Sequence, residues 1–293
     1  MRRIARTLLP ALGLLAASSA ASTARAQFDA FGLANVAGAG QQLVRFNTAS
    51  PGTTSAVTVT GATLTGIDFR PATGTLYGFN GSAVFTVNLL TGAATQVGAG
   101  IGTTVAGNVG FDFNPMVDRI RLVGPDGTNL RLNPITGGLA ATDMPYTFGG
   151  GGSPSFSAVA YTNSVAGTVP TTTLYGIDPT AGTLVRIDNP NGGTVTTVGS
   201  LGLGTMNGVT GFDIVTVGSA NIGFFTTAGA MGSSLYRIND LSVGTATLVG
   251  NFASGLSVQG LAIAAVPEPG TWALMGTGLL GVAGLARRRR RTA

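Results

Sequence analysis

The chain contains no cysteine, histidine or lysine, and it has a single glutamate, Glu268. These absences remove the side chains that several classes of enzyme require. A Walker-type phosphate loop and a Schiff base need lysine, a Ser-His-Asp triad needs histidine, and thiol catalysis needs cysteine. Zinc sites built from cysteine and histidine are excluded for the same reason.

What the chain does contain is small and apolar. Of its 293 residues, 44% are hydrophobic, 9% are charged and 47 are glycine, and the mean hydropathy is +0.38. A disordered tail has a lower hydropathy and a higher charge than this. The composition therefore predicts a folded chain.

The N-terminal end predicts a secretory signal peptide over residues 1–26. A start with three arginines precedes an apolar run at 8–17, and the small residues Ala24 and Ala26 flank Arg25. A basic start, an apolar stretch and an A-x-A site are the parts that signal peptidase and the secretion machinery recognise. We expect cleavage after Ala26.

The C-terminal segment, 266–293, carries a second targeting pattern. A Val-Pro-Glu-Pro sequence is followed by an uncharged, mostly apolar stretch at 271–286 and then by five arginines at 287–291. As a short helix, 271–286 would rise about 24 Å, which is less than the roughly 30 Å of a hydrocarbon core. The arginines predict that this end stays in the cytoplasm.

This order of parts resembles the PEP-CTERM sorting signal. The resemblance implies a Gram-negative bacterium that makes exopolysaccharide, with export across its inner membrane and delivery to the outer surface or the extracellular matrix. It also implies processing by an exosortase near Pro267, Glu268 and Pro269. A permanent membrane anchor through 271–286 is the alternative.

The two targeting ends carry most of the positive charge. The whole chain has a net charge of +5, but the body, residues 27–265, contains seven arginines and ten aspartates and is therefore mildly acidic. Nucleic-acid binding requires a basic surface. We expect no nucleic-acid partner.

The body is a repeat of short strands rich in threonine and valine. One apolar strand recurs at 43–47, 84–88, 130–133, 184–188 and 235–239. An earlier strand recurs at 66–69, 110–113, 158–161, 211–214 and 260–263. Four strands per unit, repeated at the spacing of these copies, predict an all-β fold. The expected fold is a β-propeller of five four-stranded blades, with six blades as the alternative. We expect the strand at 260–263 to join the N-terminal blade and close the ring.

Two blocks of these repeats, 66–79 and 110–137, resemble a bacterial domain of unknown function, DUF4394. The resemblance covers nearly the whole body. It implies architecture but supplies no catalytic residues.

Asp68, Asp112 and Asp213 occupy the same place in three copies of the earlier strand, within a G-x-D-x pattern. If that strand lines the central channel, the three carboxylates converge and could hold a hard cation such as Ca²⁺ through oxygen ligands. The alternative is that each carboxylate locally satisfies backbone N–H groups or pairs with an arginine.

A second candidate site occurs in one unit only. Arg119 and Arg121 share one face of a strand, and Asp126 and Asn129 follow across a Pro-Asp-Gly turn. Because these polar residues occur in one repeat unit and not in the others, we expect them to contact a ligand. The alternative is an internal salt-bridge cluster between these arginines and Asp118.

Arginine also repeats in the other recurring strand, at Arg45, Arg131, Arg186 and Arg237. A ring of anion contacts is one interpretation. We favour a structural one, in which each arginine bridges neighbouring blades by pairing with an aspartate or a turn carbonyl, because scaffolds repeat.

These observations lead to two hypotheses about function. The first is a non-enzymatic surface or matrix protein whose propeller binds polysaccharide or another envelope component. The second is a secreted enzyme that acts on carbohydrate through aspartate carboxylates. The sequence favours the first, because it shows no catalytic motif.

Overall fold

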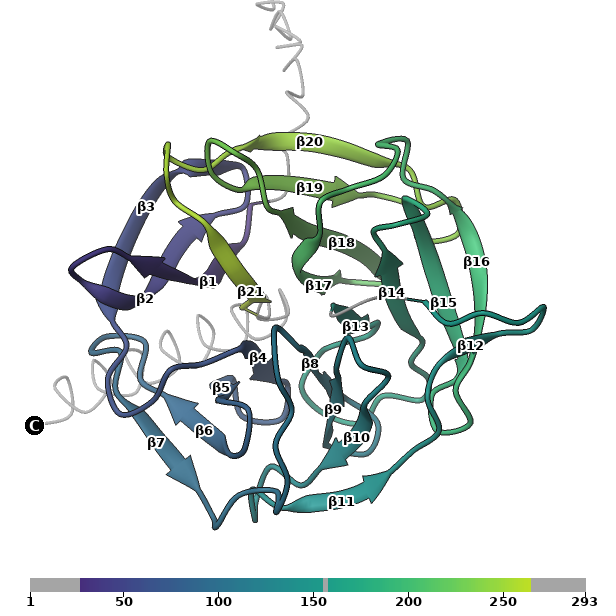
Figure 1. Cartoon of the computed structure of the whole chain (residues 1–293), viewed down its shortest axis with the longest axis horizontal. Helices are drawn as coiled ribbons and strands as arrows, with labels where there is room; N and C mark the ends of the chain where they lie inside the picture. The colour runs from purple at the N-terminus through teal and green to yellow at the C-terminus, as the bar shows by residue number, and fades with distance from the viewer. Residues whose placement is uncertain (1–26, 155–157, 265–293) are drawn as a thin grey trace, which may run out of the picture.

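The computed structural model describes residues 27–154 and 158–264. The described residues form an all-β ring of five blades around a central axis (Figure 1). The predicted five-bladed propeller is therefore confirmed. The predicted signal peptide, 1–26, and the C-terminal sorting segment lie outside the described residues.

Each blade is an antiparallel sheet whose first strand lies at the axis and whose fourth lies at the rim. From the axis outward, blade 1 contains β21 (Val258–Ile263), β1 (Asp29–Val36), β2 (Gly40–Asn47) and β3 (Ser50–Thr58). Blade 2 contains β4 (Gly66–Arg70), β5 (Thr75–Phe79), β6 (Val84–Val87) and β7 (Ala94–Val97). Blade 3 contains β8 (Gly110–Asn114), β9 (Arg119–Val123), β10 (Asn129–Leu132) and β11 (Leu139–Thr142).

Blades 4 and 5 complete the ring. Blade 4 contains β13 (Val159–Tyr161), β14 (Leu174–Asp178), β15 (Thr183–Asn189) and β16 (Thr194–Ser200), with β12 (Thr147–Phe148) added in parallel at its outer edge. Blade 5 contains β17 (Val209–Val217), β18 (Ala220–Thr227), β19 (Ser234–Ile238) and β20 (Ala246–Asn251).

The ring is closed by strands from the two ends of the body. β21 pairs antiparallel with β1, so that the last strand becomes the innermost strand of the first blade. The backbone N–H of Ala264 then bonds to the carbonyl of Asp29. Among the described residues, every blade and the closure lie within 29–264, so this part of the chain forms a closed ring by itself, and closure protects the strand edges.

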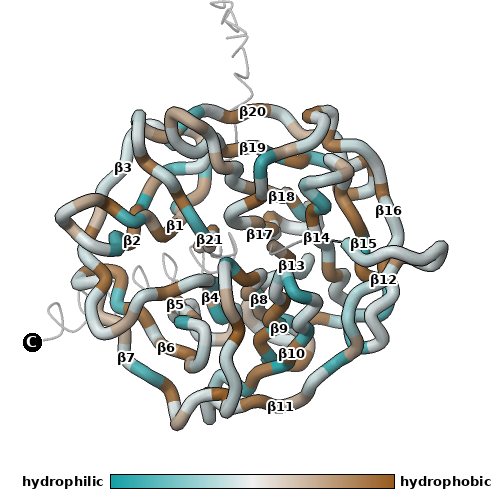
Figure 2. The backbone as a smooth tube through the Cα atoms, in the orientation of Figure 1, coloured by the Kyte–Doolittle hydropathy of each residue, from teal (hydrophilic) through white to brown (hydrophobic). Residues whose placement is uncertain are grey.

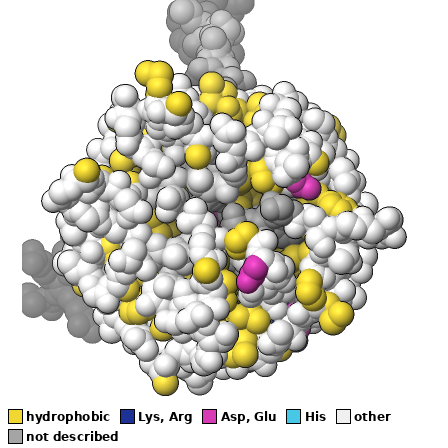
Figure 3. Space-filling model, in the orientation of Figure 1, with side chains coloured by type: hydrophobic (Ala, Val, Ile, Leu, Met, Phe, Trp, Pro, Cys, Tyr) yellow, Lys and Arg dark blue, Asp and Glu magenta, His cyan; other side chains and the backbone are white. Residues whose placement is uncertain are grey.

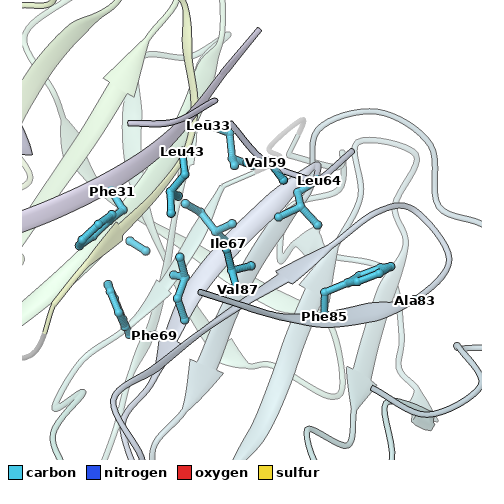
Figure 4. Close-up of a cluster of buried hydrophobic side chains, with 12 residues drawn as sticks. Phe31, Leu33, Leu43, Val59, Leu64, Ile67, Phe69, Ala83, Phe85 and Val87 are labelled. Atoms are coloured by element: carbon cyan, nitrogen blue, oxygen red, sulfur yellow. The ribbon is translucent and has the colours of Figure 1, made fainter. Parts of the chain in front are cut away.

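The hydrophobic core is divided among the contacts between blades. Five clusters of buried side chains are present, one for each pair of neighbouring blades. Between blades 1 and 2, Phe31 and Leu43 pack toward Ile67 and Phe69 (Figure 4). Apolar stretches follow the blade strands, and the loops are more polar (Figure 2). Because the blades bury apolar side chains against their neighbours, apolar and polar residues alternate along the strands. The same packing stabilises the ring without a disulfide.

The ring has two different faces. One, which we call the linker face, carries the connections from each blade to the next, at 59–65, 98–109, 201–208 and 252–257 and in the described part of 143–154. The other, which we call the turn face, carries the turns after the first strand of each blade. The chain leaves the ring at Ala264 on the turn face, next to Asp29. Figures 1 and 3 view the molecule from the linker face, which is mostly uncharged with isolated acidic side chains.

Glycine in the turn between the third and fourth strands lets neighbouring blades interlock. Gly137 has a φ of +66°, and a Cβ atom there would lie 1.8 Å from the carbonyl oxygen of Val97 in the preceding blade. Only a residue without a side chain permits this approach.

We expect Gly137→Ala to destabilise the domain by about 2 kcal/mol or more, because it adds both a left-handed strain and a clash with backbone. For a domain of this size, the melting temperature should fall by roughly 5 °C. The matched control is Gly138→Ala, where the nearest atom lies at 3.6 Å and φ is not positive. Equal melting temperatures for the two variants would show that the interlock does not matter.

Candidate functional site

Three carboxylates meet at the axis of the ring. Asp68, Asp112 and Asp213 lie at the same position of the innermost strands β4, β8 and β17, and each is at most 4% exposed. One oxygen of each lies within 4.8 Å of an oxygen of the others. The innermost strands β13 and β21 have Ala160 and Ala262 at this position, so the cluster draws on three of the five blades.

Each of these carboxylates ties its own blade to the next one. Asp68 accepts from the backbone N–H of Phe113 at 2.8 Å, and Asp112 accepts from that of Tyr161 at 2.9 Å. Asp213 accepts from the N–H of Ile263 and so joins the last blade to the closing strand. The backbone-bonding role that the sequence left open is therefore present.

Burial strongly affects the protonation of the cluster. Desolvation raises the pKa of Asp68 and of Asp112 well above the ordinary aspartate range, and the neighbouring carboxylates raise both further. Desolvation also raises the pKa of Asp213, to about 7. Three charges this close and this buried cannot all persist at neutral pH without a compensating cation. The cluster must hold protons, or else hold a metal ion.

The geometry leaves a cation possible. A cavity of about 20 Å³ adjoins Asp68 and Asp213 and is also lined by Arg70 and Ser164. That volume suits a single water or ion. Carboxylate oxygens are the ligands that Ca²⁺ prefers. Most of the oxygens already accept backbone hydrogen bonds, however, so the cation stays a prediction.

The cation prediction has a direct test. If Asp68, Asp112 and Asp213 bind Ca²⁺, the ion should raise the melting temperature of residues 27–264, and EDTA should reverse the increase. Asp112→Asn should abolish the Ca²⁺ effect. A melting temperature that Ca²⁺ leaves unchanged in the wild-type protein would rule out the cation and leave proton sharing.

The second predicted group is only partly assembled. Arg121 and Asn129 meet inside the protein, where Arg121 Nη1 donates to Asn129 Oδ1 at 2.7 Å. Arg119 is the first residue of β9, and its guanidinium donates to the carbonyl of Asp118 at 2.9 Å. Asp126 lies in the β9–β10 turn on the linker face, where its carboxylate accepts from the N–H of Thr128.

Arg121 is the centre of a buried polar network. It is 2% exposed, and it also donates to Asp143 at 2.6 Å and to Asn191 of blade 4 at 2.7 Å. The Tyr146 hydroxyl donates to Asn129 Oδ1. The acidic partner is therefore Asp143, and the expectation that Asp118 pairs with these arginines is wrong. Asp118 instead pairs with Arg70 of blade 2.

Three of the repeated arginines pair with aspartates as expected, but with aspartates of their own blades, so the predicted bridge to a neighbouring blade is wrong for these three. Arg45 pairs with Asp29, Arg131 with Asp143 and Arg186 with Asp188, each within its own blade. Arg237 lies over the ring of Phe224 in the same blade. The reason is geometric, because the third strand of a blade lies beside its own second and fourth strands.

A pocket of about 300 Å³ opens on the linker face beside the buried network. One wall is the β9–β10 turn, and the other comes from the connection between blades 3 and 4. Its lining consists of Gly124, Pro125, Asp126, Gly127, Pro145, Tyr146, Ser153 and Pro154. Of the four predicted ligand residues, Asp126 alone lines it. Sequence reasoning missed Tyr146 and Ser153, because they lie in an irregular connection without periodicity.

Comparisons with known proteins identify the family of the chain. The profile described as "Domain of unknown function (DUF4394)" matches residues 42–262. The chain belongs to the DUF4394 family. A PEP-CTERM protein-sorting motif matches residues 265–291, directly after this DUF4394 domain. Proteins with this motif are exported to the bacterial cell envelope and processed by an exosortase-type system.

Solved structures resemble the DUF4394 domain only distantly. A structural genomics protein of unknown function from Bacteroides thetaiotaomicron is 13% identical, with 83% of this chain and 68% of that chain covered and a TM-score of 0.45. The extracellular domain of a putative hybrid two-component system from the same organism is 12% identical, with 78% and 31% covered and a TM-score of 0.40. YCF48 from Cyanidioschyzon merolae is 12% identical, with 71% and 68% covered and a TM-score of 0.38.

No curated protein matches the chain. The part of the chain that the structure describes contains no helix long and apolar enough to cross a bilayer. The stretch 271–286, for which the sequence predicts an apolar helix, lies outside that part.

Proposed function

We propose that this DUF4394 protein is a non-enzymatic binding module of the outer surface or extracellular matrix, which engages polysaccharide or another envelope component. The observation that carries the proposal is the pocket between Asp126 and Ser153 on the linker face. Its volume of about 300 Å³ falls at the lower end of the range of small-ligand sites, roughly 300 to 1,000 Å³.

The position of the pocket supports this function. The chain leaves the ring at Ala264 on the turn face, and the sorting motif follows at once. The six residues between Ala264 and Thr271 span at most about 25 Å. While 271–286 is held by a membrane, the turn face therefore lies near that membrane. The pocket, on the opposite face, then points away from it.

The arrangement of the buried aspartates also favours a scaffold over an active site. Asp68, Asp112 and Asp213 accept backbone hydrogen bonds that join the blades. An enzyme acting on carbohydrate remains the second candidate, because these carboxylates approach within 4.8 Å and have raised pKa values. Two carboxyl groups about 5 Å apart are typical of retaining glycosidases. Loss of polysaccharide turnover in Asp112→Asn, with the fold intact, would support the enzyme.

The binding function is tested with purified residues 27–264 and a panel of polysaccharides. We expect at least one of them to raise the melting temperature, because a ligand selective for the folded state stabilises it. Ser153→Trp should fill the pocket and abolish the shift. The control is Ser242→Trp in the β19–β20 turn, outside the pocket. A shift that survives Ser153→Trp, or no shift with any polysaccharide, would overturn the assignment.

A further inference from the structure

We infer that the linker-face pocket selects neutral saccharide units over anionic ones, with the Asp126 carboxylate accepting hydrogen bonds from sugar hydroxyls. The inference rests on the proposed binding function and adds the chemical class of the ligand to it. It follows from the charge of the pocket, the nature of its walls and the rigidity of its base.

The pocket carries a negative charge without a counter-charge. Asp126 is the one charged residue in the described lining. Hydrogen bonds from the hydroxyl and the backbone N–H of Thr128 lower the pKa of Asp126, so this carboxylate is ionised at neutral pH. Uronate and sulfate groups would be repelled by it. Hydroxyl groups are donors that a carboxylate accepts well, and its two oxygens suit adjacent hydroxyls.

The arginine of the buried network does not offset this charge. The guanidinium of Arg121 is 2% exposed and already donates to Asn129, Asp143 and Asn191. It is held inside the domain by acceptors that face it from blades 3 and 4. An anionic ligand would therefore find no available arginine among the described residues that line the pocket.

The remaining walls are uncharged and partly apolar. Pro125, Pro145 and Pro154 contribute rings, while Gly127 contributes exposed backbone. Proline rings offer flat apolar surface to the C–H face of a sugar, and glycine lets a ligand approach the backbone closely. Such a mixture of apolar surface and a few polar groups is typical of small-ligand sites.

The base of the pocket is rigid. Tyr146 is 5% exposed, and its hydroxyl bonds to Asn129, whose amide donates to the carbonyls of Met144 and Pro190. The bond to Pro190 joins the β15–β16 turn of blade 4 to the wall of the pocket. A preformed site loses less entropy when it binds a ligand.

The test measures the affinity of residues 27–264 for three soluble glycans by calorimetry: a neutral glucan or mannan, a uronate polymer and an amino-sugar polymer. We expect binding of the neutral glycan and at least tenfold weaker binding of the uronate. Asp126→Asn should weaken neutral-glycan binding about tenfold, the effect of losing one hydrogen bond to a charged group. Asparagine can still cap the turn, so the fold should be unaffected.

The matched control is Asp240→Asn. Asp240 caps its own turn in the same way, through the N–H of Ser242, but it lies outside the pocket, on the β19–β20 turn. The Asp240→Asn variant should bind the neutral glycan with the affinity of the wild-type protein. Preferred binding of the uronate or the amino sugar, abolished by Ser153→Trp, would overturn the inference and leave the proposed function standing. Absence of glycan binding altogether would overturn both.

Discussion

Replacing Arg121 by methionine is expected to destabilise the domain by about 3 to 5 kcal/mol, because it removes one partner of a buried ion pair and leaves Asp143 underpaired. Asn129 and Asn191 would each lose a charged donor as well. For a domain of this size, the melting temperature should fall by roughly 10 °C. Urea unfolding of the two proteins measures the difference directly.

The matched control lies on the same strand. Arg119→Met changes the same residue type, but the described partners of Arg119 are nearby backbone carbonyls, and its side chain is partly exposed. Its effect should stay within about 0.5 kcal/mol, as for most surface substitutions. If the two variants unfold at the same urea concentration, the Arg121 network does not hold blades 3 and 4 together.

The aspartate cluster predicts an unusual dependence of stability on pH. Asp213 has a pKa near 7 in the folded protein against an ordinary value of 3.8, and burial raises the pKa of Asp68 and Asp112 in the same direction. The folded state thus binds more protons than the unfolded state between about pH 4 and pH 7. The contribution of these groups to the free energy of unfolding is greatest below that pH window and is lost as the pH rises through it. For the shift of Asp213, the free energy of unfolding that is lost is on the order of 4 kcal/mol.

Asp112→Asn tests this prediction. The amide oxygen can keep the bond from the N–H of Tyr161, and the amide NH₂ can donate to the remaining carboxylates. In the absence of divalent cations, we expect the variant to be more stable than the wild type at pH 8 and to change less between pH 5 and pH 8. A wild-type protein that is more stable at pH 8 than at pH 5 would contradict the assigned protonation.

Much of the fold could be predicted because it depends on local patterns. The G-x-D-x strand at Asp68, Asp112 and Asp213 marks the innermost strand of three blades, and the period between copies sets the blade count. The closure followed from the fifth copy, at 260–263, which falls at the C-terminal end of the body. Repetition at a fixed strand position also placed the three aspartates together at the axis.

The candidate site was harder to predict because its contacts are non-local. Arg121 and Asn191 are 70 residues apart and come from different blades. Asp143 follows a short outer strand without any pattern that distinguishes it from Asp118. The pocket wall at Tyr146 and Ser153 belongs to an irregular connection. The in-blade pairing of Arg45, Arg131 and Arg186 likewise depends on the positions of neighbouring strands.

The central claim is that the linker face binds ligand while the axis and the turn face serve as scaffold. Hydrogen–deuterium exchange of residues 27–264, with and without saturating neutral glycan, tests it most directly. The account predicts slower exchange at 124–128 and 145–154, with no change in the turns at 70–74 and 217–220. Protection confined to the turn face, or exchange that the glycan leaves unchanged throughout, would contradict it.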